Sequence, residues 1–136
     1  MTLTYEINTA IKKALGNITY QNDPVPYYDM VRDDGAQVHI YNARISSEYD
    51  GNKTKDLYQV TVHLVVRHFF SPGISGTDVV DEVGAQLEEA MKTNLTLDSW
   101  NVVVQYLDST FCTQNSRKAG NEVIKAYIYR MIIEEK

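Results

Sequence analysis

The clearest pattern in the chain is a nearly regular alternation of apolar and polar side chains between Leu57 and Phe70. A period of two residues is typical of a β-strand that buries one face. At about 3.3 Å per residue this strand reaches about 45 Å, so its outer part is expected to project or to lie on a neighbour. The apolar face comprises Tyr58, Val60, Val62, Leu64, Val66 and Phe70, and the more polar face comprises Gln59, Thr61, His63 and Arg67.

A second strand is predicted over 37–46, and the dipeptide Asp50-Gly51 after it is a favourable hairpin turn. If the chain turns there, the two strands pair in an antiparallel hairpin that projects from the sheet. This pairing places His39 opposite His63 on the polar face.

Two segments have the spacing of amphipathic helices. The first runs over 3–15 with Thr2 or Thr4 as its cap, and the second has Thr77 or Asp78 as its cap and ends near residue 92. The apolar positions are Leu3, Ile7, Ile11, Ala14 and Leu15 in the first helix, and Val80, Val83, Leu87, Ala90 and Met91 in the second.

The remaining segments complete the outline of the fold. A short strand over 18–20 leads into a proline-containing extended segment, and further strands are predicted over 100–107 and 122–133, with a long polar loop over 108–121 between them. We therefore predict a single α+β domain over 1–136. It has a mostly antiparallel β-sheet, two amphipathic helices packed on one face and a long projecting β-hairpin.

The last predicted strand is apolar on both faces. The helices shelter only one face of an antiparallel sheet, so the other face needs a separate cover. In a chain this short, we expect another subunit to supply it. One face carries Val123, Tyr127, Tyr129, Met131 and Ile133, and the other carries Ile124, Ala126, Ile128 and Ile132.

Composition narrows the functional classes. The chain has 136 residues, 43% of them hydrophobic, which suits one domain with one core. Its formal net charge of −5 disfavours a basic nucleic-acid groove. A single cysteine excludes an internal disulfide, which suits the reducing environment of the cytoplasm. No stretch of the sequence approaches the roughly 20 apolar residues of a membrane span, so we expect a soluble protein with no membrane partner.

Candidate chemical groups are few. His39 and His63, if paired, are the best candidates for metal ligands or an acid–base pair, but the pairing brings no carboxylate or cysteine to them. Cys112 has no nucleophile motif around it, and the stretch 71–76 lacks the Gly-Lys-Ser/Thr ending of a phosphate-binding loop. We therefore predict no catalytic residue, no metal site and no cofactor.

The ten tyrosines point to protein contacts, because tyrosine is common both in strands and at interfaces. Two alternatives stay open: a metal- or ligand-binding enzyme that uses His39 and His63, and an adaptor or immunity-type module that binds another protein. The side chains expected to contact other subunits are Tyr49, Tyr58, Phe69, Phe70, Phe111, Arg117, Lys118, Tyr127 and Tyr129.

The order and spacing of these segments resemble the tail terminator and tail-completion (head–tail neck) proteins of tailed bacteriophages. The stretches that carry the resemblance are ITYQNDPVPYYDM, VTVHLVVRHFFSPG and GTDVVDEVGAQLEEAM, and the polar loop over 111–121 departs from the family pattern. The resemblance implies a non-enzymatic structural subunit of the virion that forms a ring, sixfold or larger, at the head–tail junction. It also implies assembly in the host bacterial cytoplasm, neighbouring portal, neck or tail-tube proteins, and a channel that phage DNA passes without sequence-specific binding.

Overall fold

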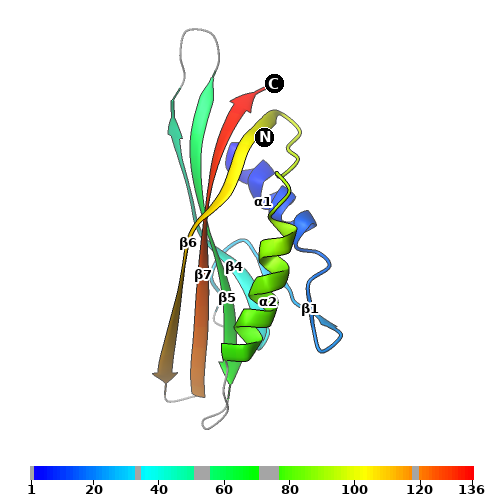
Figure 1. The fold of residues 1–136 in the computed structure, drawn as a ribbon, viewed down its shortest axis with the longest axis vertical. Coiled ribbons are helices and arrows are strands. Elements are labelled where there is room, and N and C mark those ends of the chain that lie inside the picture. Colours follow the sequence, from blue (N-terminus) through cyan, green and yellow to red (C-terminus); the bar gives the residue numbers. More distant parts are fainter. Residues whose placement is uncertain (1, 33–34, 51–55, 71–76, 118–119) are drawn as a thin grey trace.

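The computed structural model describes residues 2–32, 35–50, 56–70, 77–117 and 120–136. A long five-stranded sheet forms one layer, and both helices lie on the same face of it (Figure 1), which confirms the predicted α+β class. Within the described residues, neither helix is long and apolar enough to cross a membrane. The elements are α1 (Leu3–Ala14), β1 (Thr19–Tyr20), β2 (Asp23–Pro24), β3 (Tyr27–Tyr28), β4 (Val38–Tyr49), β5 (Leu57–Phe70), α2 (Thr77–Ala90), β6 (Trp100–Arg117) and β7 (Gly120–Glu135).

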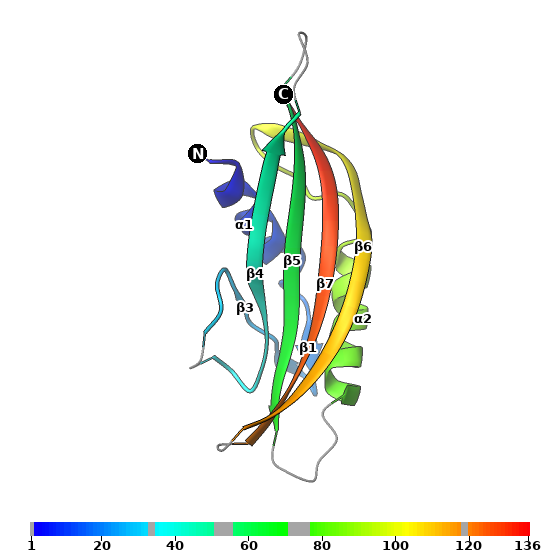
Figure 2. The ribbon, with the colours of Figure 1, turned by 90° about the vertical axis from the view of Figure 1, so that its left-hand side faces the viewer.

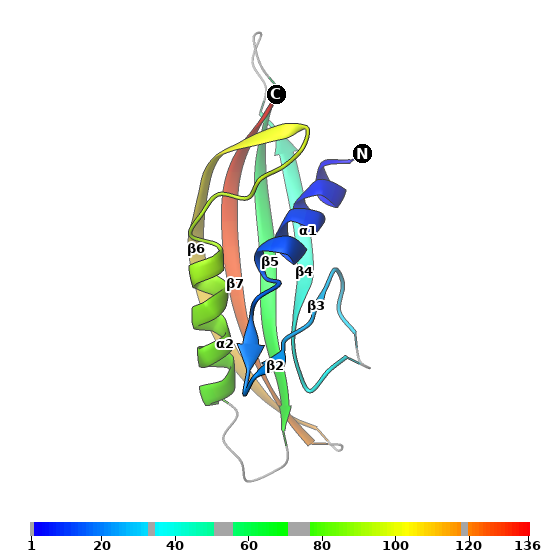
Figure 3. The ribbon, with the colours of Figure 1, turned by 90° about the vertical axis from the view of Figure 1, so that its right-hand side faces the viewer.

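The strand order in the large sheet is β3-β4-β5-β7-β6, in which the β3–β4 pair is parallel and the other pairs are antiparallel. The central strands β5 and β7 pair from Leu57 opposite Glu134 to Phe70 opposite Asn121. β1 and β2 form a separate two-stranded hairpin. We call the face beneath the helices the inner face (Figure 3) and the opposite, helix-free face the outer face (Figure 2).

The hydrophobic core lies between the inner face and the two helices. The alternation predicted for β5 is confirmed, because its apolar face points into this core. Burying one Val, Leu, Ile or Phe side chain contributes about 1.5–3 kcal/mol to the free energy of unfolding, so this core is the main source of stability. Its most deeply buried members include Ile7, Ile11, Val62, Leu64, Val66, Val80, Val83, Leu87, Tyr127 and Ile133.

One of the two helices begins with a cap that the sequence predicted. At α1 the hydroxyl oxygen of Thr2 accepts a hydrogen bond from the backbone N–H of Tyr5 at 3.2 Å, which confirms one of the two predicted caps. Thr77 and Asp78 are the first two residues of α2, so neither of them precedes the helix as its cap. The glycine-bearing stretch 71–76 lies outside the described residues.

The predicted polar loop over 108–121 is wrong. β6 continues to Arg117, and its residues from Ser109 to Asn115 pair in register with β7 from Ile128 to Glu122. Alternation of apolar and polar residues marks a strand only when one face is buried, and the side chains from Ser109 to Gln114 are exposed on both faces. Backbone pairing with the apolar β7 holds this part of β6 in the sheet. The local sequence of β6 does not reveal that pairing.

The predicted pairing of His39 with His63 is also wrong. His39 lies opposite Arg67, and His63 lies opposite Arg44. The cause is the length of the connection: the pairing ends at Tyr49 and Tyr58, so the connection is longer than a turn at Asp50-Gly51. A bulge in β4 between Asn42 and Arg44 moves His39 one residue back toward His63, which does not restore the predicted pairing. Gly51 itself lies outside the described residues.

The contact between α2 and β7 depends on a glycine. A Cβ atom at Gly84 would overlap the hydroxyl and the Cζ atom of Tyr127, which is fully buried beneath the helix. Glycine lowers the intrinsic stability of a helix by about 1 kcal/mol relative to alanine, so its presence here reflects the close approach of the ring.

We expect Gly84→Ala to lower the free energy of unfolding by about 1–3 kcal/mol, because overpacking outweighs the gain in helix propensity. Urea denaturation measures the change. Adding Tyr127→Phe should restore part of the loss, since it removes the atom nearest to the new methyl group. A Gly84→Ala variant more stable than the natural protein would contradict this account of the packing.

Candidate assembly surfaces

The outer face carries an apolar row that crosses the whole sheet. The strand register places Tyr28, Tyr41, Val65, Ala126 and Phe111 side by side on β3, β4, β5, β7 and β6. The three middle members are 8%, 5% and 2% exposed, and Tyr28 packs against them. Phe111, at the β6 end of the row, is 54% exposed. The row is therefore closed in its middle and open at the β6 edge.

A buried ion pair lies beside this row on the same face. Arg67 Nε donates to Glu122 Oε2 at 2.8 Å, and the two side chains are 3% and 0% exposed. Asn115 Nδ2 donates to Glu122 Oε1 at 3.2 Å, and Arg67 Nη1 donates to the backbone carbonyl of Arg32 at 3.4 Å. The guanidinium also lies 4.4 Å from the centre of the Phe69 ring. Both buried charges are thus paired and hydrogen-bonded, as burial requires.

His39 is fully buried opposite Arg67. Its Nδ1 donates to the carbonyl oxygen of Ala36 at 2.6 Å, and its ring centre lies 5.3 Å from that of Tyr28. Burial lowers the pKa of His39 below its ordinary value of 6.5, although the hydrogen bond to Ala36 opposes this, and the positive charges of Arg67 and Arg32 lower it further. The imidazole is therefore held in its neutral form.

These polar groups attach the segment between β3 and β4 to the outer face. Arg67 and His39 each donate to a backbone carbonyl of that segment, at Arg32 and Ala36. The charges are neutralised within the cluster, and no three His, Cys, Asp or Glu side chains of the described residues are arranged to hold a metal ion. The arrangement of the cluster suits a structural role.

The outer face is open nearer the start of β6. A hollow of about 310 Å³ lies over β4, β5 and β7, with Thr61 and Arg130 among its lining residues. Tyr106 and Ile132 also line it and are 49% and 38% exposed, and Val104, the strand partner of Ile132, is 38% exposed. Ile132 belongs to the second apolar face predicted for the last strand, so that face is covered within the chain at Ala126 and uncovered at Ile132.

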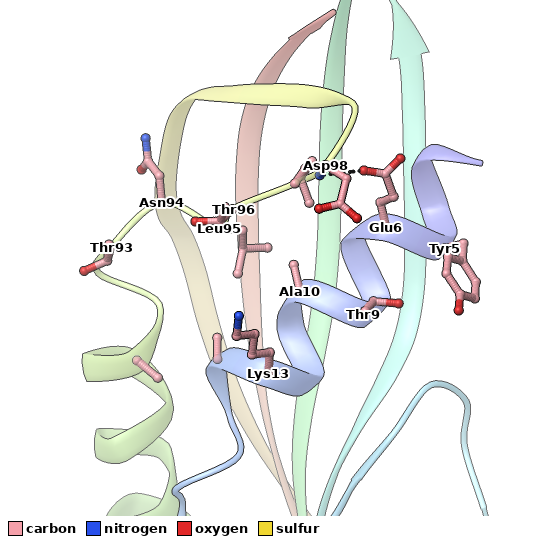
Figure 4. A pocket seen from close by; sticks show the side chains of 13 residues that line it. Tyr5, Glu6, Thr9, Ala10, Lys13, Thr93, Asn94, Leu95, Thr96 and Asp98 are labelled. Atoms are coloured by element: carbon pink, nitrogen blue, oxygen red, sulfur yellow. Dashed lines mark hydrogen bonds between the residues drawn. The ribbon is translucent and has the colours of Figure 1, made fainter. Parts of the chain in front are cut away.

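A larger groove of about 620 Å³ lies between α1 and the segment 93–98 (Figure 4). Glu6 lies at one end of it, where its Oε1 accepts hydrogen bonds from the backbone N–H groups of Asp98 and Ser99 at 2.8 and 2.9 Å. Burial acts to raise the pKa of Glu6, but the hydrogen bonds from Ser99 and Asp98 outweigh it and hold the pKa below 4.5. This carboxylate links α1 to the chain that enters β6.

The contact residues predicted from the sequence fall into four groups. The exposed members are Tyr49 and Phe111, and the partly buried members are Tyr58 and Phe69. Tyr127 and Tyr129 are 0% and 3% exposed in the chain's own core, so they are not available to a partner. Lys118 and the side chains of Phe70 and Arg117 lie outside the described part of the chain.

The sequence reasoning missed the apolar pair Met30 and Val31, which are 62% and 57% exposed in the segment after β3. A two-residue apolar stretch has no period, so pattern analysis passes over it. The available signal was its position between Asp29 and Arg32, where two charged residues flank adjacent apolar side chains. The ion pair of Arg67 and Glu122 was missed because its partners lie on non-consecutive strands.

Replacing Glu122 by leucine is expected to lower the free energy of unfolding by about 3–5 kcal/mol, because Arg67 is left buried without its counter-charge. Adding Arg67→Met should recover most of the loss, which denaturant unfolding of both variants measures. The exposed pair of Lys92 and Glu89 provides the control, since Glu89→Gln should change stability little. A double variant no more stable than Glu122→Leu would contradict this view of the pair.

Stability should fall as the pH is lowered from about 7.5 to about 5.5. The unfolded chain binds a proton at His39 near its ordinary pKa of 6.5, whereas the folded chain resists protonation because its pKa is lowered. The urea midpoint measured at both pH values should show a smaller difference in His39→Gln than in the natural protein. An equal difference in the two proteins would show that another group controls this pH range.

Comparison with known proteins gives a likeness in fold. No protein-family model matches the sequence, and no curated protein matches it by sequence. A chain in the solved structure "Virion of native gene transfer agent (GTA) particle" has the same fold, with a TM-score of 0.66 and 12% sequence identity. The match covers 97% of this chain and 94% of that chain. The two chains therefore share one architecture along nearly their whole lengths.

Proposed function

We propose that this chain is a non-enzymatic structural subunit of a virion, located at the head–tail junction of a tailed phage or phage-like particle. In this role it is a tail terminator or neck protein that forms a ring around the DNA channel. The observation that carries the proposal is the fold shared, almost end to end, with a chain of a gene transfer agent virion. The resemblance of the sequence to tail terminator and tail-completion proteins supports the same assignment independently.

The surfaces of the molecule suit assembly. Its sheet is longer than its helices (Figure 2). The exposed apolar side chains of Tyr106 and Phe111 lie on the outer face, because their strand partners Arg130 and Ala126 lie there. Subunits of a ring need such adhesive surface at two places, one for each neighbour. The neighbouring portal, neck or tail-tube proteins supply contacts at the ends of the subunit.

The charge of the chain suits a passage for DNA. With a formal net charge of −5, a ring of many copies repels the phosphate backbone, so DNA moves through without sequence-specific binding. The ring is assembled in the host bacterial cytoplasm and becomes part of the virion.

The alternative of an enzyme built on paired histidines loses its basis, because His39 and His63 lie opposite arginines on the neighbouring strands. The buried, neutral His39 is engaged with Ala36 and surrounded by aromatic rings.

Self-association at high protein concentration is the expected outcome, with a ring of six or more copies as the largest discrete species. Size-exclusion chromatography with light scattering, repeated over a rising concentration series and with cross-linking, measures it. A protein that stays monomeric throughout the series would count against the ring. A one-to-one complex with a host protein instead would favour an adaptor module.

A further inference from the structure

The apolar row on the outer face leads to exposed apolar side chains at both edges of the sheet. At one edge it ends in Phe111 on β6. At the other edge it ends in the partly buried Tyr28 on β3, and Met30 and Val31, which follow after Asp29, are 62% and 57% exposed. One line of strand register connects Phe111 with Tyr28, and Met30 and Val31 follow Tyr28 by two and three residues. The chain therefore keeps these two residues within ~10 Å of the level of Phe111.

The β6 edge near Phe111 lacks the usual protection of an edge strand. Natural edge strands carry charges, bulges or a covering segment that prevent pairing with another chain. The first half of β6 has two bulges, and the Asn94 side chain donates to the carbonyl of Val102 there. From Ser109 to Asn115 the strand runs without a register shift, and its sequence STFCTQN has no charged residue. This half of the edge has the composition of a contact surface.

The opposite edge of the sheet presents a matching surface. β3 has only two residues, so the chain leaves the sheet after Tyr28 and turns outward through Asp29 to Arg32 (Figure 2). The backbone of this segment is held in place by Arg67, which donates to the carbonyl of Arg32. Met30 and Val31 are thus exposed on a segment that the buried polar cluster anchors.

We propose that Met30 and Val31 of one copy pack on Phe111 of a second copy, with the segment Asp29–Arg32 lying along the Ser109–Asn115 edge of β6. The contact joins unlike surfaces, so every copy offers both halves and is bound by a neighbour on each side. Rotation about an axis along the strands keeps all copies at one height, and the row from Tyr28 to Phe111 brings the two surfaces close to one height. This inference rests on the proposed function and identifies the surfaces that form the ring.

Each half of the contact is tested by its own variant. Phe111→Ser and the double variant Met30→Ser/Val31→Ser should each weaken self-association at least about tenfold, as expected for the loss of a buried apolar anchor. Sedimentation velocity over a concentration series measures the association. Val103→Ser is the matched control, since Val103 is a 50% exposed apolar residue in the bulged first half of β6 and lies outside the Ser109–Asn115 edge. Its association should equal that of the natural protein.

A mixture of the two variants tests whether unlike surfaces meet. The intact Phe111 of one variant still fits the intact Met30 and Val31 of the other. The mixture should therefore form pairs at concentrations where each variant alone is monomeric, and these pairs should not grow into rings. Because all of the substituted side chains are exposed, thermal unfolding of the variants should match that of the natural protein.

The outcomes separate this contact from the proposed ring. A Phe111→Ser variant that associates like the natural protein, or a mixture that forms no pairs, overturns the contact and leaves the ring in place through other surfaces. A natural protein that stays monomeric at every concentration overturns both proposals.

Discussion

The structure depends on covering long strands with short helices. A helix rises about 1.5 Å per residue and a strand about 3.3 Å, so the same number of residues covers less than half the length. The helices have 12 and 14 residues, and β6 has 18. Placed one after the other along the inner face, the helices reach ~40 Å, against ~60 Å for β6. The helices therefore cover only part of the inner face, where residues outside them such as Leu95 and Leu97 also join the core, and the outer face has no helix at all (Figures 2 and 3).

The outer face is stabilised by a different kind of interaction. Instead of a helix, the segment between β3 and β4 folds against it and is held by hydrogen bonds from Arg67 and His39. Buried charges add little net stability compared with apolar side chains of the same size, but they penalise any arrangement that leaves them unpaired. Arg67 and Glu122 therefore fix the position of β7 relative to β5, and through Arg32 they fix the neighbouring segment as well. The buried Arg67 and Glu122 thereby determine the shape of the outer face next to them.

Sequence reasoning predicted the helices and strands that have one buried face and one exposed face. Both helices and β5 were predicted, since their apolar positions recur at the period of the element. The second half of β6 was not, because a strand exposed on both faces has no such period. The histidine pairing failed for another reason: the pairing of β4 and β5 ends at Tyr49 and Tyr58, so the connection is longer than the turn that Asp50-Gly51 suggested. Of the predicted contact residues, Tyr127 and Tyr129 were misjudged as available because tyrosine suits cores and interfaces equally well.

The strand order also governs when the chain can fold. The strand that pairs with β5 in the middle of the sheet is β7, and α2 and β6 are synthesised between them. Until β7 has left the ribosome, β5 has a partner on one side only, and the inner face has no central ridge for α2 to pack upon. A nascent chain therefore leaves one side of its most apolar strand unpaired while about the last half of the sequence is synthesised, which makes early release hazardous and gives chaperones a long period in which to bind it.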